Sequence, residues 1–79
     1  MEMTKKDDGT FDVEVMAYLE DQEQWIACAI EHNGLCTHSF THPARPEVIF
    51  FTFNFENRTD LNAFAKQALW FLLTTERVS

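Results

Sequence analysis

Two cysteines and three histidines lie within one stretch of fifteen residues, and these residue types could bind a metal. They are Cys28, His32, Cys36, His38 and His42, and zinc accepts thiolate and imidazole ligands in tetrahedral sites. The two cysteines are eight positions apart, however, and the stretch contains no Cys-x-x-Cys pair of the kind found in zinc sites. Cys28 and His32 also share the side of an apolar run that we assign to the core. We therefore interpret Cys28 as a core residue and the histidines as scattered loop residues, and we expect no metal and no cofactor.

Cys36 and His38 could also act as a nucleophile and its base, with Glu31 as the orienting acid. Residues two apart on a strand point to the same side, so this pair could be in contact. Nothing around the pair is typical of an oxyanion hole, and a chain of 79 residues is small for a substrate cleft. Two glycines in the whole chain cannot build a phosphate-binding loop either. These features favour a protein that is not an enzyme.

The net charge of −7 lies entirely in the first 31 residues, which carry nine acidic residues and two lysines. Residues 32–79 carry four acidic and four basic residues, which cancel. An acidic surface attracts basic partners and repels phosphates, so we expect no direct binding to nucleic acid or to membranes. The polar residues 1–10 predict no secretion signal, and the longest apolar run, residues 68–73, is far shorter than the roughly 20 residues of a membrane span. We expect a cytoplasmic protein with reduced thiols.

The N-terminal third is predicted to contain a leader and a strand. Residues 1–9 are charged and end in Asp-Asp-Gly, which indicates a flexible leader before a single domain over residues 10–79. Apolar residues then alternate with mostly polar ones from Phe11 to Leu19. A period of two with one apolar side is typical of a half-buried strand.

The run of residues 25–32 is interpreted as a second strand that forms a hairpin with the first. The register that joins the two apolar sides is then fixed, because a slip of one residue would turn every side chain to the other face. In that register Glu14 lies near Glu31 on the outer face. Like charges on neighbouring strands are destabilising, so folding alone does not explain this pair.

The C-terminal half is predicted to contain two further strands. Residues 35–41 form a short third strand, and the two prolines in residues 42–46 indicate a loop. The run of residues 48–55 is predicted to be the strongest strand in the chain. In it Ile49, Phe51, Phe53 and Phe55 alternate with Phe50, Thr52 and Asn54, and β-branched and aromatic residues favour strands.

A helix capped by Thr59 or Asp60 is predicted to run to about Glu76. At about 100° per residue, one side of it gathers a core face made of Leu61, Phe64, Ala65, Ala68, Leu69, Phe71 and Leu72. Trp70 falls on the opposite side, so it is expected to be covered by a loop, a second copy or a partner. The simplest assembly is an α+β fold, an antiparallel meander of three or four strands with this helix across one face. The other face is then open, and it carries acids together with Met16, Tyr18, Trp25 or Phe50.

The acidic hairpin is the candidate binding surface. Its residues, with the separate aromatic on the helix, are Asp12, Glu14, Tyr18, Glu20, Asp21, Glu23, Trp25, Glu31 and Trp70. Carboxylates at strand spacing can imitate a row of phosphates, and Tyr and Trp are typical anchors of interfaces. The main hypothesis is a small non-catalytic inhibitor that occludes a basic, nucleic-acid-binding surface of a larger protein, as inhibitors encoded by phages or mobile elements do.

Three alternatives stay open. The acidic residues could serve solubility alone. The chain could be a homodimeric structural or small-ligand-binding module in which the open sheet face or Trp70 forms the dimer contact. It could also be a small metal or thiol protein that uses its cysteines and histidines.

Overall fold

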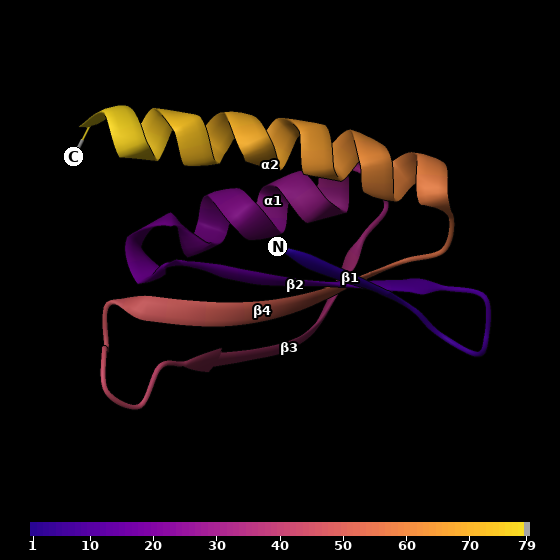
Figure 1. The fold of residues 1–79 in the computed structure, drawn as a ribbon, viewed down its shortest axis with the longest axis horizontal. Coiled ribbons are helices and arrows are strands. Elements are labelled where there is room, and N and C mark those ends of the chain that lie inside the picture. The colour runs from indigo at the N-terminus through magenta and orange to yellow at the C-terminus, as the bar shows by residue number, and fades with distance from the viewer. Residues whose placement is uncertain (79) are drawn as a thin grey trace.

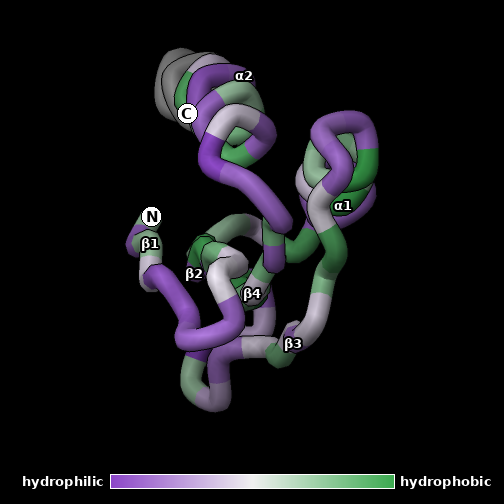
Figure 2. The backbone as a smooth tube through the Cα atoms, turned by 90° about the vertical axis from the view of Figure 1, so that its right-hand side faces the viewer, coloured by the Kyte–Doolittle hydropathy of each residue, from purple (hydrophilic) through white to green (hydrophobic). Residues whose placement is uncertain are grey.

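The computed structural model describes residues 1–78, and the side chains of residues 1–70 (Figure 1). The elements in chain order are β1 (Glu2–Lys5), β2 (Phe11–Tyr18), a 3₁₀ turn (Leu19–Asp21), α1 (Gln22–Glu31), β3 (Leu35–Thr41), β4 (Val48–Phe55) and α2 (Arg58–Val78). Figures 1 and 2 show both helices on one side of the sheet, with the opposite side uncovered. The predicted α+β class, with an antiparallel sheet and a C-terminal helix, is confirmed.

The strands form one sheet in the order β1-β2-β4-β3, and every neighbouring pair is antiparallel. The order differs from a simple meander because β4 lies between β2 and β3. Two antiparallel steps make β2 and β3 parallel, and α1 connects them across the helical side of the sheet. The centre of the sheet is therefore the eight-residue pairing of β2 with β4, from Phe11 opposite Phe55 to Tyr18 opposite Val48.

The prediction of a second strand over residues 25–32 is wrong, because this segment belongs to helix α1. The buried residues of α1 are Trp25, Cys28 and Ala29, a spacing of three and four that matches the helical period. The dipeptide Asn33-Gly34, which the sequence offers as a turn, ends the helix instead. Asn33 has a φ of 63°, and the Gly34 amide donates to the Ala29 carbonyl at 2.7 Å, which together are typical of a Schellman cap.

Residues 1–9 were expected outside the sheet, but they contribute its edge strand β1. Met3 lies opposite Val13 and Glu2 opposite Glu14 in an antiparallel register. The turn that joins β1 to β2 is closed by Asp8, whose Oδ1 accepts hydrogen bonds from the Thr10 amide at 3.0 Å and the Thr10 hydroxyl at 2.6 Å. Residues 1–9 are thus part of a hairpin with β2.

The core lies between the sheet and the helices and is built largely on phenylalanine, as the side-chain alternation in β4 predicts. Phe51, Phe53 and Phe55 are buried, and the ring of Phe64 from α2 lies 5.4 Å from Phe53 and 5.0 Å from Phe55, centroid to centroid. Aromatic contacts at these separations stabilise beyond the area they bury.

The core face predicted for the C-terminal helix is confirmed in part. Leu61, Phe64 and Ala68 are buried, whereas Leu69 is exposed. The side chains of Phe71 and Leu72 lie outside the described residues. Neither of the helices in the described chain is long and apolar enough to cross a membrane.

Candidate binding surface on the open face of the sheet

The side of the sheet opposite the helices, here called the open face, is organised in rows that cross the strands. One row is polar and runs Glu2, Glu14, Thr52, His38. The next row toward the end of β2 is apolar and runs Met16, Phe50, Phe40. The two rows lie side by side because residues two apart on a strand share a face.

An aromatic patch occupies the part of the open face near the end of β2. It consists of Met16, Tyr18, Phe40, His42 and Phe50. The ring of Phe50 stacks with Phe40 at a centroid distance of 5.0 Å and with His42 at 5.7 Å. Met16 is 63% exposed, Phe40 61% and Tyr18 44%. Large apolar side chains exposed next to one another mark an interaction surface more often than isolated ones do.

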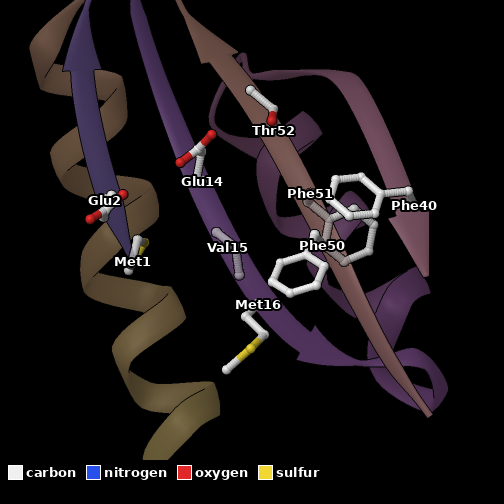
Figure 3. A pocket seen from close by; sticks show the side chains of 9 residues that line it. All are labelled: Met1, Glu2, Glu14, Val15, Met16, Phe40, Phe50, Phe51 and Thr52. Atoms are coloured by element: carbon white, nitrogen blue, oxygen red, sulfur yellow. The ribbon is translucent and has the colours of Figure 1, made fainter. Parts of the chain in front are cut away.

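Two carboxylates lie next to this patch. Glu2 and Glu14 are Cα partners on β1 and β2, so both side chains lie on the open face on adjacent strands (Figure 3). Like charges placed directly opposite destabilise a sheet. Lys6 pairs with Asp12 and Arg45 with Glu47, and among the described residues neither Glu2 nor Glu14 forms a salt bridge.

The carboxylate pair and the aromatic patch meet in a depression with a volume of about 370 Å³. Its lining consists of Met1, Glu2, Glu14, Val15, Met16, Phe40, Phe50, Phe51 and Thr52. Figure 3 shows the side chains of Glu14, Met16, Phe50 and Thr52 around it, contributed by the two central strands. We call this site the Glu2–Glu14 depression.

The residues predicted from the sequence are distributed over three places. Tyr18 and Glu14 lie on the open face, as predicted, and Glu20, Asp21 and Glu23 follow Tyr18 in the 3₁₀ turn and the first turn of α1. The amide of Leu19 donates to the Glu47 carbonyl at 2.7 Å, which fixes this acidic turn beside the loop between β3 and β4.

Asp12 belongs to a hydrogen-bond network of the sheet. Its Oδ1 accepts from the Asn54 side-chain amide at 2.8 Å, and its Oδ2 lies 3.9 Å from Lys6 Nζ. The same Asn54 amide donates to the Thr10 hydroxyl at 3.0 Å. Asp12 is therefore already engaged within the protein and is a weak candidate for binding a partner.

The remaining predicted residues do not lie on the open face. Trp25 is only 3% exposed and packs in the core, with its ring 6.2 Å from that of Phe64, so its prediction as a surface anchor is wrong. Glu31 lies at the end of α1 on the helical side, so the predicted Glu14–Glu31 contact is wrong too. Trp70 is 64% exposed on α2, away from the open face.

Three residues of the surface were missed by the sequence analysis. Glu2 was assigned to the leader, although the alternation of polar Glu2 and Thr4 with Met3 is a weak strand signal. Phe40 and His42 depend on the strand β3 and on its pairing with β4, which positions them beside Phe50.

The cysteines and histidines do not converge. The register of β3 shifts between Cys36 and His38, so Cys36 aligns with the core residue Phe53 and His38 with Thr52 on the open face. The two side chains thus point to opposite sides of the sheet, and the contact that their spacing would allow on a regular strand does not form because a bulge intervenes. Among the described residues, no group of three or more His, Cys, Asp and Glu side chains could hold a metal ion.

Neither thiol is activated. Burial raises the pKa of the Cys28 thiol, and the charge of Glu31 raises it further. Burial also raises the pKa of Cys36, although its Sγ donates a hydrogen bond to the His38 carbonyl at 3.6 Å. A nucleophilic cysteine needs a lowered pKa, so the environment of both thiols opposes that chemistry.

Comparisons with protein-family models, with curated proteins and with solved structures found no match to this chain.

Proposed function

We propose that this protein is a non-catalytic interaction module that binds a basic surface of a larger protein through the open face of its sheet. The observation that carries the proposal is the meeting of an exposed aromatic patch with the unneutralised carboxylates of Glu2 and Glu14. Apolar side chains supply binding energy, and the carboxylates select a cationic partner.

The energetic cost of this arrangement supports a binding role. Met16 and Phe40 leave most of their apolar surface in water, where it contributes nothing to folding through the hydrophobic effect, and the Glu2–Glu14 pair opposes the pairing of β1 with β2. Local features that break the rules of stable folding tend to mark functional sites. A solubility role alone accounts for dispersed acids, but it does not account for acids placed beside a contiguous aromatic patch.

The charge of the chain favours the same kind of partner. With a net charge of −7, the protein attracts positively charged surfaces over long range, which raises the association rate. The acidic character extends beyond the aromatic patch, because β2 is followed by Glu20 and Asp21 in the 3₁₀ turn and by Glu23 in α1. Where the partner uses its basic surface to bind nucleic acid, occupation of that surface inhibits it, as inhibitors from phages and mobile elements do.

We assign the module to the cytoplasm. Cys28 and Cys36 are both free thiols, and free cysteines are typical of proteins in reducing compartments.

The proposal is tested by affinity capture from a lysate of the source organism, washed first at low and then at raised salt. The wild type is compared with Glu2→Gln/Glu14→Gln and with Met16→Ser, a change at an exposed position that should not affect folding. A matched control, Glu31→Gln/Glu56→Gln, removes two charges from outside the open face.

We expect capture of one dominant basic protein that raised salt releases. Salt weakens attraction between exposed charges, because its screening length is only about 10 Å at 0.1 M ionic strength and becomes shorter as salt is added. Both open-face variants should capture at least about ten-fold less of this protein, as expected when an interface hot spot is lost. The control should capture as much as the wild type. Equal capture by the wild type and the Glu2/Glu14 variant contradicts the proposal.

A homodimer is the second candidate, and the edge strand β3 favours it. Its sequence, Leu35–Thr41, contains no proline and no Asp, Glu, Lys or Arg, the residues that normally protect an edge from pairing. Light scattering at high micromolar concentration should then give twice the monomer mass of 9.2 kDa. Ser39→Lys should restore the monomer, and a monomeric wild type removes this candidate.

A further inference from the structure

We infer that the Glu2–Glu14 depression receives a single arginine side chain from the partner. The inference deepens the proposed function and rests on it, since it names the chemical group that the open face recognises. The charge, the lining and the size of the depression support it.

The charge of the depression favours a cationic group. Glu2 and Glu14 bring two carboxylates onto adjacent strands of the same face. Among the described residues neither carboxylate forms a salt bridge, while Lys6 pairs with Asp12 and Arg45 with Glu47 at 2.8 Å. A cationic group that enters the depression is therefore drawn to two carboxylates at once and relieves their mutual repulsion.

The lining of the depression favours arginine among the cations. The thioether of Met16, two residues along β2 from Glu14, and the ring of Phe50 on the neighbouring strand β4 border the depression beside the carboxylates (Figure 3). A guanidinium is planar, stacks on aromatic rings and donates two parallel hydrogen bonds to a carboxylate. An ammonium is a compact, strongly hydrated charge that gains less from the apolar lining. The combination of paired carboxylates with an aromatic wall therefore prefers arginine over lysine.

The size of the depression fits a single side chain. A volume of about 370 Å³ is near the lower end of the roughly 300–1,000 Å³ that small-molecule pockets occupy. The floor is formed at β2 and β4, where Val15 and Phe51 turn their side chains into the core, so the depression cannot deepen without breaking the sheet. A shallow site of this kind fits the end of one long side chain better than an enclosed ligand.

The test is an NMR titration of the ¹⁵N-labelled full chain with three capped tripeptides, acetyl-Leu-X-Leu-amide, in which X is arginine, lysine or citrulline. Citrulline keeps the shape of arginine and removes its charge. At 0.15 M salt, where charges farther than about 8 Å are screened, we expect the arginine peptide to shift the amides of Glu2, Glu14, Phe50 and Thr52. The citrulline peptide should bind at least about ten-fold more weakly and the lysine peptide about three-fold more weakly.

Variants locate the site. Glu2→Gln/Glu14→Gln should weaken the arginine peptide by about ten-fold or more, as expected when a charge-assisted hydrogen-bond pair is lost. Glu31→Gln/Glu56→Gln removes the same charge from outside the open face and should change the affinity by less than about two-fold at this salt concentration. Amide spectra of both variants report whether the fold is kept.

Three results overturn the inference: equal binding of the citrulline peptide, shifts spread over all acidic residues, or no saturable shift at all. Its failure is distinguishable from failure of the proposed function. If a partner is captured through the open face but the arginine and citrulline peptides bind equally, the proposed function stands and only the arginine site is removed. Equal capture of the partner by the wild type and by both open-face variants removes the proposed function and the arginine site together.

Discussion

The ring of Phe55 lies so close to Gly34 that a Cβ built on the glycine would be 2.5 Å from the Phe55 Cε1 atom. The glycine belongs to the cap that ends α1, and Phe55 is fully buried at the end of β4. The end of the first helix and the last core residue of the sheet are thus in direct contact, and this contact requires a residue without a side chain.

Gly34→Ala is therefore expected to destabilise the protein by about 1–3 kcal/mol, through overpacking against a buried ring and the nearby Ala29 carbonyl. The control is Gly9→Ala, where no atom lies within 4 Å of the added Cβ and only the φ of 89° opposes the change, at about 1 kcal/mol. Urea unfolding monitored by circular dichroism gives both values. A smaller effect at Gly34 than at Gly9 would show that the ring yields easily.

The two tryptophans should respond differently to truncation. Trp25→Ala removes a buried ring that contacts Phe64 and is expected to cost about 3–5 kcal/mol. Trp70→Ala changes a side chain that is 64% exposed and should cost less than about 1 kcal/mol. Unfolding curves of the two variants, with fluorescence from the remaining tryptophan, check this order. Similar losses of stability would mean that the exposed side of α2 contributes as much as the core.

These tryptophans also show where the sequence was informative and where it was not. The strands 11–19 and 48–55 were predicted close to their observed bounds because their side chains alternate clearly. The segment from Trp25 to His32 is almost continuously apolar, so it fits both a strand and a helix, and tertiary packing decides. The helix buries Trp25, which removes the aromatic anchor that the hairpin interpretation placed on the surface.

The candidate binding surface could be predicted only in part for the same reason. Glu14, Met16, Tyr18 and Phe50 follow from alternation within a single strand. Glu2 and Phe40 depend on which strands are neighbours, and that is a property of the tertiary fold. The bulge between Cys36 and His38 likewise arises from pairing with β4 and leaves no local signal in the sequence.

Asp8 should titrate at low pH. The hydrogen bond from the Thr10 hydroxyl, with that from the Thr10 amide, lowers the pKa of Asp8 below the usual 3.8. Because the folded-state pKa is depressed, the stabilising contribution is present above pH 3.8 and is lost as the pH falls through the folded-state value. A ¹³C NMR titration of the carboxyl group measures it. Thr10→Val should move the midpoint part of the way back, since the backbone donor remains, whereas Thr41→Val should leave it unchanged.

Both thiols should react slowly with iodoacetamide near neutral pH, because their raised pKa leaves little thiolate. Cys36, which is only partly buried, should react before Cys28, which is 2% exposed. Mass spectrometry of the timed reaction gives the order, and unfolding in urea should bring both rates to those of a free thiol. A fast-reacting Cys36 in the folded protein would contradict the absence of thiol activation.

The central pairing of β2 with β4 divides the molecule into two halves of the same outline, each a hairpin followed by a helix. The first half contributes Glu2, Glu14 and Met16 to the open face, and the second contributes Phe40 and Phe50. Neither half alone lines the depression with both a carboxylate and an aromatic ring. The proposed recognition site is thus assembled where the two halves pair, and it forms only when residues nearly forty positions apart, such as Glu14 and Thr52, lie opposite each other in the sheet.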